Sequence, residues 1–581
     1  MAEARTLPIA AEHREFTVKV DGTEVARSEQ LVAAYITKAV NKISSARLVY
    51  LDGSASSGEF PLSNSGTFVP GKEVEILAGT ANDSVSLFKG IVVRQSVKVR
   101  DHIAPQLVIE CRHKAVKLTV GRKNAYFFDK KDSDIISELL QKASVDGGVE
   151  ATAVTHKQQV QYYCTDWDFL LARAEANGKL VLTNSEKAEV KKPDFSSTAV
   201  CSVQFGATIL ELDAEIDARQ QYGAVKSFSW DAAQQNVLEK DAADPGVSGP
   251  GNLKSSDLAQ VIGLDHFQMQ HAAVTEDEAQ AWADSEWLRS QMSRVSGRVK
   301  CEGIGTVNPG SIVALGGISD RYNGNVFVSG VRHDFDLVHL WKTHLQFGSV
   351  DKVSGDERDG ISAPKASALL PGVSGLQIGV VVSNEDPQGE HRVRVRMPLV
   401  SAGEDGTWAR VVSLDAGAER GFFFRPEIGD EVALGFLNDD PRQAIILGML
   451  HSSAKAAPLP GSDDNHEKVF QSRSKMKVYF NDDKKVLRLE TPAGNKIVLS
   501  EDEKLLKLED QNGNKIEMTP DGIKIESAKA LQLKGGTEMK IESGTAFSAK
   551  GGTSLKLEGA ASAEISSSAT TKLKGGLVQI N

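Results

Sequence analysis

The C-terminal part of the sequence repeats an apolar position every eight residues, and this period constrains the fold more than any other feature. A second apolar position lies two residues before the first in most units, and the residue between the two is polar. This alternation is typical of a short strand with one buried face. Glycines such as Gly535, Gly536 and Gly551 lie between the units, where a regular turn needs a permissive backbone. The repeated position, which we expect to form a buried core, holds Ile525, Leu533, Ile541, Ala549, Leu557, Ile565 and Leu573.

The apolar face of such short strands has no partner layer within its own unit. Two arrangements would bury it. Three chains can intertwine, each giving one strand per level to a three-sided β-prism, or one chain can coil alone with three units per turn. Each large apolar side chain contributes about 1.5–3 kcal/mol on burial, and the same stripe left exposed would promote aggregation. The repeat therefore requires a covered face and leaves both arrangements open.

A longer repeat lies just before the eight-residue units. The segment from Arg488 to Ile497 recurs nineteen residues later as Lys507 to Ile516. Asn512-Gly513 in the second copy is a strong turn signal. We therefore predict strand–turn–strand units that lead into the array.

Stretches rich in Gly, Pro, Ser and charged residues interrupt the chain at Lys240–Ser256, Lys352–Gly372 and Ser452–Asn465. Such composition favours turns and exposed connections. The last two predict domain boundaries, and the first is either a boundary or a long surface loop. We expect three domains, over residues 1–365, 372–452 and 466–581, because 581 residues exceed what one core supports.

The first domain mixes strand and helix patterns, which predicts an α/β region. Strands are expected at Glu15–Val20, Glu73–Leu77, Leu107–Glu110, Ser311–Leu315 and Asn325–Val331, and helices at Asp134–Ala143, Trp167–Asn177 and Glu276–Met292.

The second domain shows strand patterns separated by turn signals, which favours a small closed barrel. Five or six strands are expected, and the candidates are Gly379–Val382, Arg392–Met397, Trp408–Ser413, Gly421–Phe424, Glu431–Phe436 and Ala444–Leu450.

Charge and composition exclude several classes of function. The formal net charge of −11 argues against a nucleic-acid partner, whose phosphates need a basic face. The apolar run Ala444–Leu450 is too short for a membrane helix, which needs about 20 residues. Charges in the first sixteen residues argue against a secretory signal. The four cysteines show no metal or redox spacing, so we expect buried free thiols.

Motifs for catalysis, cofactors and metals are not found, so we predict a protein that is not an enzyme and has no cofactor or metal site. The pair His466-Glu467 lacks the second His of a zinc motif, since Phe470 stands in its place. The run that begins at Asp510 resembles a calcium loop, but Lys515 replaces the required glycine. We interpret that run as a turn.

Ordered motifs along essentially the whole chain resemble VgrG proteins, the fusion of a phage-type baseplate hub with its central spike. In the hub region the similar segments include Glu110–His113, Gln161–Tyr162 and Val331–His333. In the barrel region they follow the family's OB-fold pattern in order and spacing, at Gly379–Val382, Arg392–Val395, Trp408–Val411, Pro426–Val432 and Asp440-Pro441.

The resemblance implies a mainly β protein: an α/β hub of β-barrels with helical insertions over 1–365, an OB-fold collar over 372–452, and a C-terminal intertwined trimeric β-prism, or β-helix, over 466–581. It favours the trimer, with the eight-residue positions as trimer core. It implies a structural homotrimer that caps the inner tube of a contractile injection system and punctures a target membrane when the sheath contracts. The alternative is a trimeric adhesin or tail-fibre stalk that binds a receptor.

The partners implied by the resemblance are an Hcp-like tube protein, baseplate proteins, a PAAR-like tip protein, possible effectors and, transiently, the target membrane. Residues expected to bind the tip protein are Leu577, Val578, Ile580 and Asn581, because an open prism end would expose strand edges and apolar surface. The protein is expected to assemble in the bacterial cytoplasm without a signal peptide and to leave as part of a type VI secretion apparatus or an extracellular phage-tail-like particle.

Overall fold

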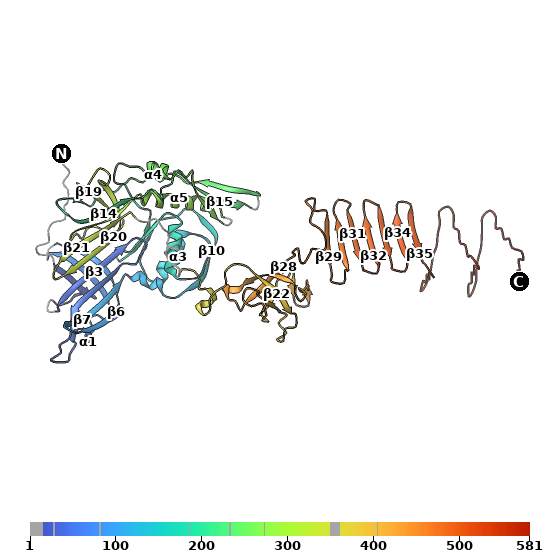
Figure 1. Ribbon diagram of the computed structural model, residues 1–581, viewed down its shortest axis with the longest axis horizontal. Helices are drawn as coiled ribbons and strands as arrows, with labels where there is room; N and C mark the ends of the chain where they lie inside the picture. Colours follow the sequence, from blue (N-terminus) through green and yellow to red (C-terminus); the bar gives the residue numbers. More distant parts are fainter. Residues whose placement is uncertain are drawn as a thin grey trace. The chain divides into compact units, whose positions relative to one another are not determined.

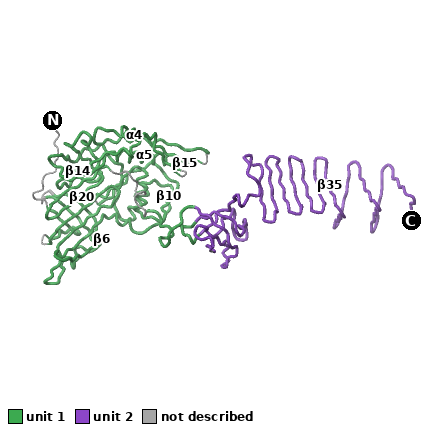
Figure 2. Tube along the Cα trace, viewed as in Figure 1, with its two compact units in different colours: residues 1–375, 436–443 green, residues 376–435, 444–581 purple. Residues whose placement is uncertain are grey.

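The computed structural model describes residues 15–26, 29–80, 83–184, 186–231, 234–271, 274–348, 361–403 and 405–580. The chain forms two compact units, coloured separately in Figure 2. Unit 1 comprises residues 1–375 and 436–443, and unit 2 comprises residues 376–435 and 444–581.

Unit 1 is built on one thirteen-stranded sheet. Its main path runs, in spatial order, through β14 (Ile209–Ile216), β18 (Val295–Glu302), β21 (Leu340–Phe347), β20 (Gly324–Asp336), β3 (Leu31–Ala39), β4 (Ser45–Leu51), β7 (Ile103–Arg112), β6 (Asp83–Arg100), β5 (Glu73–Thr80), β1 (Glu15–Val20) and β2 (Thr23–Glu24). The remaining strands are β19 (Ile312–Gly316), which pairs with β20, and β13 (Cys201–Gln204), which pairs with β19. All five strands expected in this region are present.

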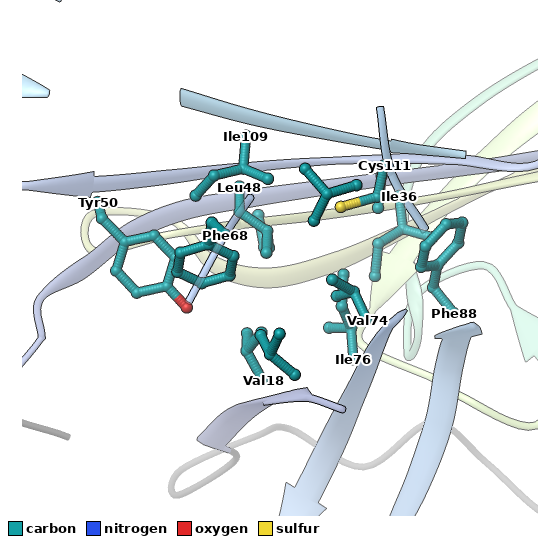
Figure 3. Packing of buried hydrophobic residues seen from close by; sticks show 14 of the residues in the cluster. Val18, Ile36, Leu48, Tyr50, Phe68, Val74, Ile76, Phe88, Ile109 and Cys111 are labelled. Carbon is teal, nitrogen blue, oxygen red and sulfur yellow. The ribbon is translucent and has the colours of Figure 1, made fainter. Parts of the chain in front are cut away.

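Two large hydrophobic cores contain residues of this sheet. The first contains Leu48, Phe68 and Ile76, each fully buried (Figure 3). The second contains Val313 and Val328, also fully buried. In β20 both faces are buried: Val326 and Val328 belong to the second core, and Phe327 between them belongs to a separate cluster.

Helices and small sheets are inserted between the strands of unit 1 (Figure 1). The helices are α1 (Pro61–Asn64), α2 (Asp132–Lys142), α3 (Asp166–Glu175), α4 (Ser255–Ile262) and α5 (Glu276–Met292), with the 3-10 turns η1 (Lys114–Thr119) and η2 (Lys365–Ala368). The strands are β8 (Lys123–Lys131), β9 (Gly147–Val149), β10 (Thr155–Cys164), β11 (Leu180–Leu182), β12 (Ala188–Lys191), β15 (Val225–Asp231), β16 (Asn236–Asp241) and β17 (Phe267–His271). Three of the helices are those expected from the sequence, within two residues at each end.

Local sequence explains where two of these helices begin. The Thr165 side chain accepts a hydrogen bond from the amide of Asp168 at the start of α3. Thr275 and Glu278 form a reciprocal capping box at the start of α5. Such caps pair backbone amides that a helix start leaves without an acceptor.

A buried ionic network joins α2 to α3, β10 and α5. Asp132, at the first turn of α2, is contacted by Arg173 of α3 and by His156 of β10. The other ring nitrogen of His156 lies 2.9 Å from a carboxylate oxygen of Glu278 in α5. The network therefore connects four elements that are far apart in the sequence.

All four cysteines lie in unit 1 as buried free thiols, as predicted. Burial raises the pKa of Cys111 and of Cys301 to about 12. A thiol held in its neutral form is a poor nucleophile and a poor metal ligand. These residues therefore act as small core side chains.

Unit 2 begins with a closed five-stranded barrel. Around the barrel the strands follow the order β22 (Gln377–Ser383), β23 (Val393–Arg396), β24 (Thr407–Val411), β28 (Ala444–Met449) and β27 (Glu431–Phe436). Val381, Val393, Val395, Val432 and Ile446 fill its interior and are almost fully buried.

The prediction of a barrel strand at Gly421–Phe424 is wrong. Only Gly421 is paired there, in a two-residue ladder between β25 (Ala416–Gly417) and β26 (Arg420–Gly421) outside the barrel. Phe422, Phe423 and Phe424 are 50%, 72% and 68% exposed. A run of apolar residues without alternation does not define which face a strand would bury, and here the run forms an exposed segment.

The rest of unit 2 is a seven-stranded antiparallel meander (Figure 1). Its strands are β29 (Glu467–Gln471), β30 (Lys477–Asn481), β31 (Val486–Glu490), β32 (Lys496–Ser500), β33 (Leu505–Glu509), β34 (Lys515–Thr519) and β35 (Gly522–Glu526). The nineteen-residue repeat corresponds to β31–β32 and β33–β34, which confirms the predicted strand–turn–strand units. Within the described residues, no helix is long and apolar enough to span a membrane.

Candidate functional site

The meander presents one apolar face made of two rows of side chains. Because every neighbouring pair of strands is antiparallel and in register, apolar residues stand opposite one another from strand to strand. The first row is Val478, Leu489, Ile497, Leu508, Ile516 and Ile525, and the second is Phe480, Leu487, Leu499, Leu506, Met518 and Ile523. We call these two rows the apolar face.

No other part of unit 2 covers the apolar face fully. Leu489, Ile497 and Leu508 are 37–39% exposed, and the fraction rises to 69% at Ile523. An open groove of about 1240 Å³ runs along the first row. Monomeric proteins rarely expose a continuous apolar surface of this kind, which usually marks an interface.

The opposite face of the meander is mostly polar and charged, and it also holds Val486, Val498 and Leu505. Arg488 lies over the ring of Tyr479, with 4.7 Å between the guanidinium carbon and the ring centroid. Lys496 Nζ lies 3.1 Å from a Glu509 carboxylate oxygen, and Lys515 Nζ lies 3.0 Å from one of Glu526. The two faces of the sheet therefore differ, because one is mostly polar and the other is apolar and partly exposed.

After Glu526 the chain continues as a zigzag without hydrogen-bonded strands among residues 527–580 (Figure 1). Bends recur every eight residues, at 528–529, 536–537, 544–545, 552–553, 560–561, 568–569 and 576–577. The period read from the sequence is therefore the period of the backbone. The short strands expected in each unit are not paired within this chain, because each unit is separated from the next by a bend and has no neighbour of its own chain.

Glycine is required at only one position of two Gly-Gly bends, at Gly535 and at Gly551. A Cβ on Gly551 would lie 2.1 Å from the carbonyl oxygen of Ser554, closer than any real contact, whereas a Cβ on Gly552 meets nothing within 4 Å. Serine occupies the equivalent position in other units, and Ser543 Oγ donates a hydrogen bond to the carbonyl of Ala546 at 2.6 Å. The bend is therefore formed either by a missing side chain or by a side chain that caps it.

The seven residues predicted as trimer core follow directly from the first row of the apolar face. Ile525 is the last residue of that row, and Leu533, Ile541, Leu557, Ile565 and Leu573 are 61–72% exposed in the single chain. Ala549 is also exposed. Of the expected tip residues, Leu577, Val578 and Ile580 are 84%, 51% and 84% exposed, and Asn581 lies outside the described residues.

The apolar rows before Ile523 are the functional residues that the sequence reasoning missed. Their signal was present, because each of these five-residue strands places two apolar residues two positions apart, as the later units do. Because these pairs of apolar residues recur within a nineteen-residue repeat and not an eight-residue one, they were not recognised as the same pattern.

Clusters of side chains that could hold a metal ion are not seen in the described part of the chain. No three His, Cys, Asp or Glu side chains there gather as a metal site. The Asp510 carboxylate accepts hydrogen bonds from the amides of Asn512 and Asn514, which confirms the turn interpretation. Hydrogen bonds from Asn514 and Asn512 lower the pKa of Asp510 to about 2. The arrangement is suited to assembly through an apolar face.

Three family models match the chain in the order of these parts. The Alg8 N-terminal domain matches residues 10–336, which is more than half of the chain. The type VI secretion system/phage-baseplate injector OB domain matches residues 377–451, over the closed barrel. The phage baseplate V C-terminal trimerisation domain matches residues 486–581, over the meander from β31 and the eight-residue units.

Similar proteins include two curated spike proteins and a solved structure. The type VI secretion system spike protein VgrG1b of Pseudomonas aeruginosa is 24% identical over 380 residues, which is 60% of this chain and 49% of that protein. The spike protein VgrG3 of Vibrio cholerae is 32% identical over 136 residues, 22% of this chain and 13% of that protein. The chain thus spans half or less of the length of these relatives.

A type VI secretion system component of E. coli, of known structure, is 12% identical, with 74% of this chain and 99% of that chain covered and a TM-score of 0.37. The three family models together match residues 10–336, 377–451 and 486–581. With its N-terminal region in the Alg8 N-terminal domain family, its injector OB barrel and its baseplate trimerisation segment, the chain belongs to the VgrG-type hub and spike proteins.

Proposed function

We propose that three copies of this chain intertwine over residues 466–581 into a three-sided β-prism. The prism acts as the spike of a contractile injection system, the barrel over 372–452 as its collar, and the region 1–365 as the hub that caps the inner tube. The function is mechanical, with no reaction catalysed by the chain. On sheath contraction the spike would puncture the target membrane.

One observation carries the proposal. The apolar face continues from the meander into units that bend every eight residues and pair with no strand of their own chain in the described segment 527–580. Strand backbone groups and apolar side chains in that segment need partners of matching period. Two further copies of the same chain supply them, whereas a single-chain coil would pair unit with unit within the chain.

The mass of the full chain in solution tests this proposal. We expect light scattering to give about three times the chain mass of 62.5 kDa, in non-ionic detergent as well as in buffer. Detergent is used because it would dissociate copies held together only by loose apolar contacts, whereas it would not separate copies with interlocked strands. A well-folded monomer under both conditions would overturn the proposal.

The partners that we propose for the assembled spike are those of its family. An Hcp-like tube protein would stack on the hub, baseplate proteins would surround it, and a PAAR-like protein would cap the tip and bring effectors. The target membrane would be a transient contact. The exposed side chains of Leu577, Val578 and Ile580 support the tip contact, because three copies would place nine apolar groups at one end of the prism.

Removal of the tip residues should abolish capture of a tip protein without affecting the trimer. We expect a chain lacking residues 574–581 to lose at least ten-fold in recovery of a PAAR-repeat protein from the native source, as measured by quantitative pull-down. A chain with Lys572→Ala provides the control, since it keeps all the apolar tip residues. Equal recovery by all three chains would remove the proposed tip contact.

A further inference from the structure

Lysine and glutamate alternate across the charged face of the meander, one residue on each strand. Register places them in a continuous line from Lys477 of β30 to Glu526 of β35. We call this line the charge ladder, and it consists of Lys477, Glu490, Lys496, Glu509, Lys515 and Glu526. Ion pairs of 3.1 Å and 3.0 Å join Lys496 to Glu509 and Lys515 to Glu526.

The same alternation continues in the eight-residue units, one position after the predicted trimer core. The residues there are Lys534, Glu542, Lys550 and Glu558, until Ser566 ends the series. We call these four the octad ladder. Where the octad ladder holds glutamate, a lysine lies two residues earlier on the same side of the backbone, and Lys540 Nζ is 2.6 Å from Glu542. The octad ladder therefore continues the line of the charge ladder, one residue after the repeated apolar position of each unit.

The apolar and charged patterns have different periods. The apolar core repeats every eight residues, so sliding one chain along the others by one unit buries the same kinds of side chain. The charge pattern repeats every sixteen residues, because lysine and glutamate alternate between successive units. Of these two patterns, only the charges distinguish one register from the next.

Geometry determines which charges meet in a three-sided prism. Each chain moves to the next side with each unit and returns to the same side after three units. Two ladder residues, or rungs, that are neighbours on one side of the prism therefore come from different copies and from successive units. In the correct register Lys534 of one copy meets Glu526 and Glu542 of the others, whereas a slip of one copy by one unit brings lysine beside lysine and glutamate beside glutamate.

We propose that the octad ladder binds the second and third copies of this chain and determines their register. This inference rests on the proposed trimer. Like charges directly opposite each other on neighbouring strands are unfavourable, and opposite charges are favourable. The ladder thereby excludes slipped trimers that the apolar core alone would allow.

Co-expression of two chains with opposite ladders tests the proposal. The inverted chain carries Lys534→Glu, Glu542→Lys, Lys550→Glu and Glu558→Lys, so nearly all the ladder residues of its own trimer alternate correctly. In the natural register they pair like charges with the natural chain everywhere except where the unchanged Glu526 of the inverted chain meets Lys534. A slip of one unit would restore opposite charges, but it would also move the meander of the inverted chain by one unit relative to the meanders of the other copies. We expect native mass spectrometry of differently tagged chains to find mixed trimers at less than about one tenth of their statistical share. The exclusion should weaken in 1 M salt, which screens exposed charges.

A chain with Glu538→Lys serves as the matched control. It makes the same chemical change four residues from Glu542, at a position where the preceding and following units hold Ala530 and Ala546. This chain should mix statistically with the natural one. Statistical mixing of the inverted chain would overturn the ladder while leaving the trimer intact, whereas monomers in every sample would overturn the proposed function itself.

Discussion

Replacement of Leu533 by glutamate is expected to abolish the trimer of the full-length chain. In the proposed prism the three Leu533 side chains meet at one level of the axis, and burial of three leucines contributes about 5–9 kcal/mol. The replacement also places three carboxylates in an apolar interior, where an unpaired charge is strongly unfavourable. We expect at least a 1000-fold loss in association, measured by light scattering over a concentration series.

Gln532→Glu is the matched control for this prediction. It introduces the same side chain one residue earlier, on the charged side of the same strand, beside Lys534. The side chains of adjacent residues in a strand point to opposite faces, so the two variants place the same carboxylate in opposite environments. We expect Gln532→Glu to remain trimeric. Trimers of equal stability for both variants would contradict the assignment of Leu533 to the core.

Local patterns explain why much of the fold could be predicted from the sequence. The helix Glu276–Met292 was predicted to the residue because its apolar positions lie within one segment, and the structure shows a Thr275–Glu278 cap at its start. The barrel strands alternate over a few residues each. Gly421–Phe424 failed because three successive phenylalanines carry no alternation from which a buried face could be inferred.

Contacts between distant segments could not be predicted in this way. The pair β3–β20, which joins the two halves of the large sheet, matches Thr37 with Arg332, and no periodicity connects them. The eight-residue repeat predicted which residues form the apolar row but not what covers it, because an apolar side chain carries no information about its partner. The charge ladder carries that information and was missed, since its period is twice as long.

Replacement of Asp132 by alanine is expected to destabilise the helical part of unit 1 by about 3–5 kcal/mol, the usual result of removing one partner from a buried ion pair. The Asp132 side chain is 1% exposed. It accepts hydrogen bonds from Arg173 Nε at 2.6 Å and Nη2 at 2.9 Å, and from Asn177 at 2.9 Å. Backbone amides of α2 and α3 in the full chain should therefore be less protected from hydrogen exchange in this variant.

Asp129→Ala is the control, because Asp129 forms only a surface ion pair with Lys157, in which both side chains are largely exposed. Exposed pairs contribute about 0–1 kcal/mol, so exchange in α2 and α3 should hardly change. Equal protection in both variants would mean that Arg173 finds other partners when Asp132 is removed, and that the network does not hold the helices together.

Low pH should weaken the same ionic network in the natural chain. Burial alone would raise the pKa of Asp132, but hydrogen bonds from His156, Arg173 and Asn177 and the charge of Arg173 outweigh it and hold the pKa well below its ordinary value. A carboxyl whose folded pKa is lowered stabilises the fold above its unfolded pKa of about 3.9 and loses this contribution as the pH falls further. Protection of α2 and α3 should therefore decrease below about pH 4, and Asp132→Asn, which cannot titrate, should lack that component of the decrease.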